Sequence, residues 1–336
     1  MTGAVVERPF ARRFLEYGRA HPEAICLSAD LTSSCEADDF RRELPGQFYS
    51  MGMAEQNLMG VAAGLAREGL RPFVTTFGVF ATRRPYDQVA MSIAYPRLPV
   101  RLIGFLPGLT TPGGVTHQAV DDVALMRTLP NMTVLETADA TDVETVFDLF
   151  DRIDGPVYCR MLRGQVPRLF TTPMPPDGCR VLRRGTDVVV ASSGILAEAC
   201  LDAVAALAAT GVSATHLHVS TLKPFNDAVL QQHLDACPGG VVTAENHLVV
   251  GGLGDAVATV IAGQGLARRQ VRVGLQDRFG HGGSREYLLR HYGLTALAVV
   301  DAVEALLGTS CEGARSRLGR PAGAPAAGST ATAEAL

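Results

Sequence analysis

Residues 52–66 have the sequence Gly52-Met53-Ala54-Glu55-Gln56-Asn57-Leu58-Met59-Gly60-Val61-Ala62-Ala63-Gly64-Leu65-Ala66. Glycine, alanine and large aliphatic residues fill this segment at spacings that predict a helix buried on every side. One carboxylate, Glu55, stands at its N-terminal end. A buried carboxylate has to be paired, hydrogen-bonded or protonated, so Glu55 is a candidate functional acid. The alternative is that Glu55 faces water at the positive end of the helix dipole, and these residues alone support both interpretations equally.

Short apolar segments alternate with helical patterns on both sides of this helix. The predicted strands cover residues 24–30, 48–51, 72–76, 100–104, 132–135 and 157–160, and the predicted helices cover 8–20, 81–94, 118–127 and 141–152. Apolar strands without alternation, separated by helices, predict a parallel sheet covered on both faces. The expected fold class is therefore α/β, with a doubly wound and mainly parallel sheet.

A second unit of the same kind follows a break in the pattern. Residues 164–186 are rich in proline, arginine and threonine and lack periodicity, which predicts a linker after a first domain of residues 1–163. A second doubly wound domain is expected over residues 187–308. Its predicted strands are 188–192, 213–219, 241–245 and 271–273, and its predicted helices are 197–209, 255–262 and 284–307. The small-residue tail, 309–336, has little to bury and is expected to be disordered.

Composition narrows the class of protein. The 336 residues are 47% hydrophobic with a formal net charge of -4, a balance that gives no indication of a basic, nucleic-acid-binding face. No apolar run reaches the length of a membrane span, and the first residues lack the apolar core of a signal peptide, so we expect a cytoplasmic protein. Seven cysteines without a C-x-x-C motif indicate reduced, mostly buried thiols rather than disulfides or a metal site.

Two local motifs are assigned to packing. Gly251-Gly252-Leu253-Gly254 follows a strand and opens a helix, but it lacks the G-x-G-x-x-G spacing and a later acidic residue. Tight packing of strand against helix explains these glycines better than phosphate binding. His216 and His218 would share one face of a strand without a third metal ligand nearby, and we interpret them as core or surface histidines.

Other polar and aromatic residues fall at one edge of the predicted first sheet. Phe77 and Phe80 follow a buried strand, His117 lies where a glycine-rich loop enters a helix, and Arg163 follows the last strand. Each has an ordinary explanation: core packing for the phenylalanines, a structural role for the histidine, and an ion pair for the arginine. Ligands of open α/β sheets bind at the carboxyl ends of the strands, so their common position is the stronger observation.

Taken together and in order, these residues resemble the C-terminal half of transketolase, from about Arg8 to Leu307. The resemblance rests on ordered blocks: Asp30-Leu31-Thr32, Gly52-Met53-Ala54-Glu55-Gln56-Asn57, Thr76-Phe77-Gly78-Val79-Phe80, Arg84-Pro85-Tyr86-Asp87-Gln88, Thr116-His117-Gln118, Leu129-Pro130-Asn131-Met132-Thr133-Val134, Gly155-Pro156-Val157-Tyr158, Thr243-Ala244-Glu245-Asn246-His247 and Gly251-Gly252-Leu253-Gly254. It implies a thiamine-diphosphate pyrimidine-binding domain followed by a transketolase C-terminal domain.

The resemblance also implies roles for cofactor-binding residues. Glu55 matches the glutamate that hydrogen-bonds the N1′ atom of the thiamine aminopyrimidine and favours the tautomer that activates the thiazolium. Phe77 and Phe80 match the aromatic positions that line the pyrimidine, with Phe80 the better candidate for stacking. Asp30, which begins the first matching block, is assigned to the same cofactor-binding group.

A second group of residues is implied to bind substrate. His117 matches the histidine that touches the donor hydroxyl and takes part in catalysis. Arg163 matches an arginine near the substrate phosphate, and Ser34 falls near another position of that phosphate-binding corner. Arg84 matches an arginine of split transketolases and deoxyxylulose-phosphate synthase at the same rim.

The resemblance further implies that the diphosphate-binding half of the enzyme lies on another polypeptide. Full-length members carry a diphosphate-binding domain with a Gly-Asp-Gly motif, and no Gly-Asp-Gly occurs in this sequence. The sequence therefore predicts a split enzyme, in which an N-terminal transketolase subunit holds Mg²⁺ and the diphosphate. This chain is expected to form at least a dimer, and a heterotetramer with that partner.

Two departures affect the expected substrate. Gly113 stands where the family often has an acidic residue that contacts a sugar hydroxyl, and Phe105 stands near a missing histidine. Both changes are expected to remove polar groups from the substrate channel. We expect thiamine chemistry to be kept, while the usual pair of pentose phosphates is not assured.

Three functions remain open at this point. The leading one is transfer of a two-carbon ketol unit from a ketose to an aldehyde. The second is a beta-type subunit of a 2-oxo-acid dehydrogenase or decarboxylase, or a condensation like that of deoxyxylulose-phosphate synthase. The third is a non-catalytic partner subunit, which would have no need of Glu55 and both phenylalanines.

Overall fold

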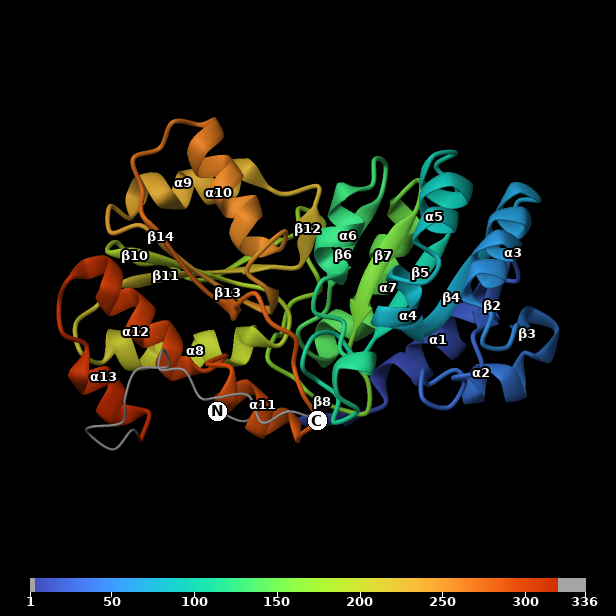
Figure 1. Ribbon diagram of the computed structural model, residues 1–336, viewed down its shortest axis with the longest axis horizontal. Helices are drawn as coiled ribbons and strands as arrows, with labels where there is room; N and C mark the ends of the chain where they lie inside the picture. The colour runs from blue at the N-terminus through green and yellow to red at the C-terminus, as the bar shows by residue number, and fades with distance from the viewer. Residues whose placement is uncertain (1–3, 320–336) are drawn as a thin grey trace.

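A computed structural model describes residues 4–319, and these form two α/β domains that lie side by side (Figure 1). The first domain occupies the blue-to-green half of the chain and the second the yellow-to-red half. Within the described residues, no helix is both long and apolar enough to cross a membrane. The α/β fold class and the two doubly wound sheets expected from the sequence are confirmed.

The sheet of the first domain has the strand order β12-β6-β7-β5-β4-β2-β3. Its neighbouring strands are parallel except for β12, which pairs antiparallel with β6. Strands such as β2 and β5 are buried along their whole length, because helices cover both faces of the sheet. The strands are β2 (Ala24–Ser28), β3 (Phe48–Ser50), β4 (Arg71–Phe77), β5 (Arg101–Phe105), β6 (Thr133–Glu136), β7 (Val157–Met161) and β12 (Thr221–Lys223).

Each face of this sheet has its own helices. One face packs against α1 (Pro9–Ala20), α2 (Asp38–Glu43) and α7 (Ala140–Arg152), through a core rich in phenylalanine. The other packs against α3 (Glu55–Arg67), the π-helical turn η2 (Val89–Ala94) and α6 (Asp122–Thr128), through aliphatic side chains. The remaining short elements are β1 (Val5–Glu7), η1 (Pro45–Gln47), α4 (Gly78–Thr82), α5 (Tyr86–Gln88), η3 (Val115–His117) and β8 (Gln165–Pro167), and β1 pairs with β8.

The second sheet has the order β14-β13-β10-β11-β9, and only its edge strand β9 runs antiparallel to its neighbour. One face carries α8, α12 and α13, and the other carries α9 and α10. The elements are β9 (Cys179–Arg183), β10 (Val188–Ser192), α8 (Leu196–Ala208), β11 (Ala214–Val219), α9 (Asp227–Ala236), β13 (Val241–Leu248), α10 (Leu253–Gly263), β14 (Gln270–Leu275), α11 (Arg285–His291), α12 (Ala296–Leu307) and α13 (Glu312–Arg317).

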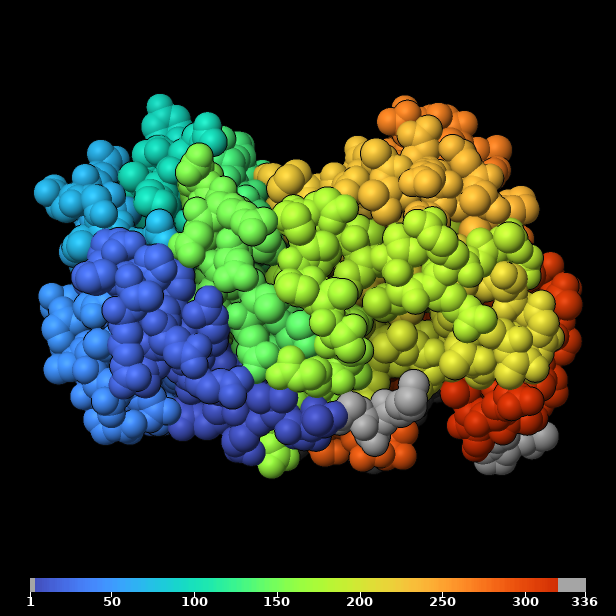
Figure 2. Space-filling model, turned by 180° about the vertical axis from the view of Figure 1, so that it is seen from behind, coloured from blue at the N-terminus to red at the C-terminus, as the bar shows by residue number. Residues whose placement is uncertain are grey.

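The two domains are joined by more than their linker. Strand β12 follows β11 in the sequence but completes the sheet of the first domain. Both hydrophobic cores continue across the boundary, since each contains buried residues of both sheets. Seen from behind, the yellow-green residues after β7 cross the middle of the molecule from one domain to the other (Figure 2). The second domain is therefore built onto the edge of the first sheet.

The prediction that residues 52–66 form a helix buried on every side is wrong in two respects. Helix α3 begins at Glu55, because neither Gly52, with a positive φ of 71°, nor the N-cap Ala54, with φ -130° and ψ 63°, has a helical backbone. One face of the helix is also exposed, and it carries Gln56, Asn57, Gly60 and Gly64. Small residues are typical of a fully buried helix, but in α3 the glycines Gly60 and Gly64 lie on the exposed face.

Three other boundaries differ from the predictions. The helix expected over 81–94 is divided into α4, α5 and η2, and Pro85 lies at the first break. The helix expected over 284–307 is two helices, separated by Gly293 at a φ of 70° and by the N-cap Thr295. The segment expected to be an irregular linker, 164–186, contains β8 and β9.

Some elements of the structure differ from the sequence-based predictions. Helix α9 and strand β12 were not predicted, although Asn226 caps α9 with its side chain. Helix α13 lies within the tail expected to be disordered, and its Ala314 is buried, so that expectation was wrong for residues 312–317. Residues 320–336 of the predicted tail, and residues 1–3, lie outside the described part of the chain.

Candidate active site

The residues singled out from the sequence gather at one edge of the first sheet. Phe77 is the last residue of β4, Arg163 follows β7, and Glu55 begins the helix that follows β3. His117 ends the loop that follows β5. Because these strands are parallel neighbours, their carboxyl ends meet at the same edge, and loops there bring side chains together from distant parts of the sequence.

Glu55 is buried at the positive end of α3 and is paired. Its side chain is 6% exposed, and its Oε1 accepts a hydrogen bond of 2.8 Å from Nη1 of Arg84. The backbone carbonyl of Arg84 accepts a hydrogen bond from Gln56, the residue next to Glu55. The carboxylate is therefore neither a bare buried charge nor a solvated helix cap, and its partner is the arginine in the turn between α4 and α5.

An aromatic cluster lies beside this pair. The ring centres of Phe77 and Phe80 are 5.9 Å apart, and the imidazole of His117 stands edge-on to both, at 5.9 Å and 5.4 Å. The Arg84 guanidinium lies 4.1 Å from the centre of the Phe80 ring, and that of Arg163 lies 5.9 Å from Phe77. Five of the predicted site residues thus form one connected group with Glu55.

Two predicted site residues are not joined to this group by a direct contact in the described structure. Asp30 lies beyond the end of β2, is exposed and has a positive φ of 63°. Ser34 is half-buried on the following loop, and the next residue, Cys35, lies close enough to Arg163 for the two to interact electrostatically. Ser34 is thus near the Arg163 side of the group, and Asp30 is not placed in contact with it.

The two departures noted in the sequence have different positions. A Cβ atom on Gly113 would lie 3.3 Å from Cγ of His117, so this glycine lies directly against the imidazole. Phe105 is fully buried and packs edge-on against Phe10 at 5.0 Å between ring centres. The expectation that Phe105 alters the substrate channel was wrong, because its side chain belongs to the core beneath the sheet.

The loop that carries His117, residues 106–118, is held by the second domain. Asn246 on β13 is fully buried, accepts a hydrogen bond from the backbone N–H of Leu109 at 3.0 Å, and donates one to the carbonyl of Pro107 at 3.2 Å. At the other end, buried Gln118 donates to the carbonyl of His281 at 2.9 Å. Both ends of this loop are therefore fixed by contacts with the second domain.

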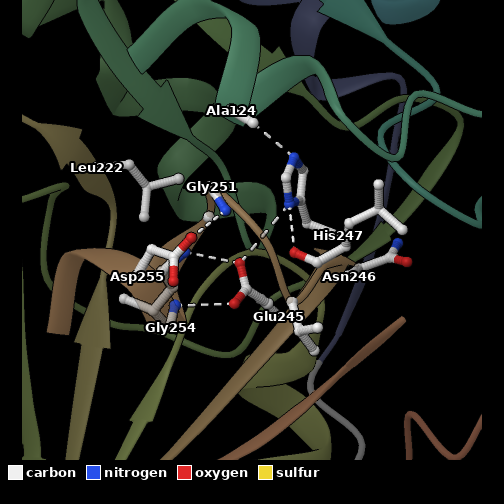
Figure 3. Close-up of polar contacts among 12 residues, drawn as sticks. Ala124, Leu222, Glu245, Asn246, His247, Gly251, Gly254 and Asp255 are labelled. Atoms are coloured by element: carbon white, nitrogen blue, oxygen red, sulfur yellow. Dashed lines mark hydrogen bonds and ion pairs between the residues drawn. The ribbon is translucent and has the colours of Figure 1, made fainter. Parts of the chain in front are cut away.

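Buried polar groups around Asn246 continue this contact between domains (Figure 3). The carboxylate of Glu245 accepts hydrogen bonds from the backbone N–H groups of Leu253 and Gly254 at the start of α10, and burial raises its pKa to about 7. Burial lowers the pKa of His247 to about 4. A neutral His247 suits its surroundings, since Nε2 accepts from Ala124 N–H at 3.3 Å and Nδ1 can donate to the Leu248 carbonyl at 2.7 Å.

A buried ion cluster supports the same boundary from the first domain. Arg160 on β7 is fully buried, donates to both Asp122 and Glu136, and also reaches the backbone carbonyl of Asn246 at 3.2 Å. Its two carboxylate partners compensate the arginine charge in this fully buried position. No local sequence pattern indicates this cluster or the contacts of Asn246. The only signal for Asn246 and Gln118 was their membership of ordered blocks.

The two motifs assigned to packing are explained by their contacts. A Cβ on Gly252 would lie 1.9 Å from Oε2 of Glu245, so the glycine is needed for the approach of α10 to β13, as predicted. His216 and His218 are fully buried core residues whose imidazoles both contact the hydroxyl of Ser192, at 2.9 Å and 3.1 Å. Burial lowers the pKa of His216 to about 3, which fits a neutral core residue.

Comparison with known proteins gives a consistent result. The sequence matches the transketolase pyrimidine-binding domain over residues 7–168 and the transketolase C-terminal domain over residues 177–299. A transketolase family protein of Sinorhizobium fredii is 38% identical over 300 residues, covering 88% of this chain and 87% of that protein. A 6-deoxy-6-sulfo-D-fructose transketolase subunit of a Clostridium species is 40% identical over 296 residues, covering 86% of this chain and 90% of that protein.

Among solved structures, the chain is similar to one described as a split gene transketolase in the form of an inactive beta4 tetramer. The TM-score is 0.82 at 40% sequence identity, and the match covers 89% of this chain and 97% of that chain. The order of the two domains and the extent of the matches agree with the arrangement described above.

Proposed function

This chain belongs to the transketolase family, and we propose that it is the C-terminal subunit of a split, thiamine-diphosphate-dependent transketolase. Such an enzyme transfers a two-carbon ketol unit from a ketose to an aldehyde. The observation that carries the proposal is the buried carboxylate of Glu55 beside Arg84, Phe80 and His117. A non-catalytic subunit would have no reason to keep an acid buried in this position.

The residues present suit the pyrimidine end of the cofactor. When bound, thiamine diphosphate supplies a carbon nucleophile and an electron sink for breaking the bond next to a ketone. Glu55 offers a carboxylate that can share a proton with a ring nitrogen, and burial strengthens such a hydrogen bond. Phe77 and Phe80 offer aromatic surface for the ring, and Asp30 is proposed to lie at the margin of this cofactor site.

The remaining side chains are proposed to act on substrate. His117 is half-exposed, and its Nδ1 lies 2.8 Å from the hydroxyl of Thr116, which leaves Nε2 to contact a sugar hydroxyl. Arg163, Arg84 and Ser34 are proposed to bind the phosphate or another anionic group of the substrate. In this arrangement Glu55 and His117 are the catalytic residues.

The magnesium and diphosphate end of the cofactor is proposed to lie on a partner subunit. No Gly-Asp-Gly motif occurs in the sequence, and no group of three metal-ligating side chains is found among residues 4–319. Two relatives of similar extent are described as a transketolase subunit and as a split gene transketolase. An N-terminal transketolase subunit would supply the missing groups, and the reduced, mostly buried cysteines fit a cytoplasmic enzyme.

The exposed face of α3 supports self-association. Met53, which precedes this helix, is 78% exposed, and Met91 and Tyr95 of the neighbouring helical segment are 57% and 76% exposed. Large apolar side chains left in water beside a face of small residues favour a protein interface. We propose that a second copy of this chain covers this surface, giving a dimer and, with the partner, a heterotetramer.

The substrate is proposed to differ from the usual pentose phosphates. Gly113 lies against His117 and offers no side chain to a sugar hydroxyl. One relative is described as acting on 6-deoxy-6-sulfo-D-fructose, a ketose with a sulfonate in place of a phosphate. A ketose with an anionic far end is therefore the class to test first.

A reconstitution experiment tests the proposal. The purified chain, a partner that carries Gly-Asp-Gly, and their mixture are assayed with thiamine diphosphate, Mg²⁺, a ketose phosphate or sulfo-ketose donor, and an aldehyde acceptor. Ketol transfer is expected only from the mixture. Full activity of this chain alone would contradict the split-enzyme proposal, and release of carbon dioxide from pyruvate would favour the 2-oxo-acid class instead.

A further inference from the structure

A cleft between the two domains is flanked by one arginine from each. Arg163 follows β7 of the first domain, and Arg285 is the first residue of α11 in the second. Both side chains are exposed, and both line the same hollow together with Leu106, Pro107 and Thr110. An adjoining hollow is again lined by both arginines and also by Glu198. The two arginines thus line a shared space rather than separate surfaces.

The charge of this cleft is largely uncompensated. Among residues 4–319, neither Arg163 nor Arg285 has a carboxylate within ion-pair distance. Glu36 is near Arg163, but its carboxylate accepts hydrogen bonds from the backbone N–H groups of Gly164 and Ala11. Glu198 is the one acidic side chain that lines the cleft. Glu36 itself does not line the cleft, so the charged lining residues are two arginines and one glutamate, and this excess of positive charge favours an anion.

The cleft also continues from the candidate active site. Arg163 lies over Phe77, which contacts His117, and Thr110 belongs to the loop that carries His117. A sugar whose reacting end lies at His117 would therefore extend its far end toward the two arginines. A guanidinium donates paired N–H groups that match the oxygens of a phosphate or sulfonate.

We propose that Arg285 is a second specificity-determining arginine, which the C-terminal domain adds to an anion subsite that it forms with Arg163. This subsite binds the tetrahedral anion, phosphate or sulfonate, at the far end of the sugar. The proposal rests on the proposed ketol-transfer function for its substrate. It gives the second domain a direct part in substrate recognition, in addition to holding the loop that carries His117.

The test compares Arg285→Ala, Arg285→Lys and a matched control, Arg290→Ala, in the complex with the partner subunit. Arg290 lies on the same helix, is exposed, and pairs with Glu286 instead of facing the cleft. Steady-state kinetics are measured with a ketose phosphate, the corresponding sulfo-ketose and a neutral ketose. Arg285→Ala is expected to raise KM for an anionic donor by about 10- to 100-fold with little change in kcat, and to leave the neutral donor unaffected. Arg285→Lys is expected to restore part of the loss.

The outcomes separate the alternatives. A loss with one or both anionic donors supports the subsite and identifies which anion it serves. An equal loss with the neutral donor, or no loss with any donor, overturns it. If the wild-type complex shows no ketol transfer at all, the proposed function fails, and binding of inorganic phosphate to this chain decides the subsite separately. Weaker binding to Arg285→Ala than to Arg290→Ala and wild type then supports it, and equal binding rejects it.

Discussion

Arg84 donates a hydrogen bond to Glu55 at 2.8 Å while its guanidinium lies 4.1 Å from the centre of the Phe80 ring. One side chain thus contacts both groups that are proposed to hold the pyrimidine ring. The carboxylate gains a cationic partner, and the aromatic ring gains a cation on its face. Glu55 is therefore buried and paired, which excludes the alternative that it faces water at the end of the helix.

Replacing Glu55 tests its catalytic role. Glu55→Gln keeps the shape of the side chain but cannot exchange a proton, so the assembled enzyme is expected to lose kcat by about 10²- to 10⁴-fold. Glu68→Gln, just beyond the other end of α3 and exposed, is the matched control and is expected to keep full activity. A Glu55→Ala complex as active as wild type would support the non-catalytic alternative.

Removing the aromatic face tests the stacking role of Phe80. Phe80→Leu keeps apolar volume but removes the ring that lies next to His117 and Arg84. We expect the Kd for thiamine diphosphate to rise about 2- to 12-fold, measured by titration of the assembled complex. Phe170→Leu, a buried ring in the separate cluster with Ala138 and Ala197, controls for the loss of a phenylalanine and should leave this Kd unchanged.

Asn246→Ala removes the side chain that binds the loop of residues 106–118. The buried backbone N–H of Leu109 loses its partner, and the carbonyl of Pro107 loses one of two donors and keeps only the hydroxyl of Thr110. The expected cost is about 2–5 kcal/mol in the free energy of unfolding, measured by denaturant titration. Asn226→Ala removes a helix N-cap on α9 and is expected to cost only about 1 kcal/mol. An equal loss in the free energy of unfolding for the two variants would contradict the prediction that the contacts of Asn246 stabilise the fold more than a helix cap does.

The raised pKa of Glu245 predicts a dependence of stability on pH. Burial raises this pKa from 4.5 to about 7, so the folded protein favours the protonated acid. Between those values the unfolded chain has lost the proton and the folded protein has kept it. The free energy of unfolding therefore falls as pH rises from 4.5 to 7, by up to about 1.4 kcal/mol per pH unit from this group.

Glu245→Gln does not titrate, so its stability relative to wild type should increase over the same pH range. Exposed Glu286→Gln is the control for loss of one negative charge. A constant difference between Glu245→Gln and wild type from pH 4.5 to 7 would contradict the prediction.

The proposed dimer surface can be tested by charge. Met53→Asp and Met91→Asp place carboxylates on exposed apolar positions next to α3, where burial against a second copy would be costly. Sedimentation at several concentrations is expected to show a shift toward monomer. Val250→Asp, at a 62% exposed position of the second domain, is the control and should not change the mass. An unchanged mass in the methionine variants would place the interface elsewhere.

Sequence patterns predicted the layers of the fold because they are local. Buried strands such as Ala24–Ser28 and Arg101–Phe105 are short apolar runs. The expectation that residues after parallel strands meet at the carboxyl edge of the sheet correctly grouped Phe77, His117 and Arg163. Sequence patterns failed where contacts with the rest of the fold determine which face of a helix is buried. The face of α3 with Gly60 and Gly64 has the composition of a buried helix, and only the folded chain shows that it is open.

The contacts of the second domain were beyond a sequence pattern for a different reason. Asn246 and Leu109 are 137 residues apart, and nothing near either residue indicates the other. Gly108 has a φ of 55°, and a Cβ on it would lie 2.3 Å from the carbonyl oxygen of Asn246. Such a glycine is visible in a sequence, but its neighbour is known only after folding.

The hydrogen bonds between Asn246 on β13 and the loop of residues 106–118 have a consequence for protein engineering. A chimera that exchanges second domains between relatives at residues 164–186 would separate Asn246 from the loop that it was selected with. Such recombinants need the loop and β13 from the same parent, together with Gln118 and the segment around His281 that it binds. The crossover point suggested by the linear domain order is therefore a poor place to join two parents.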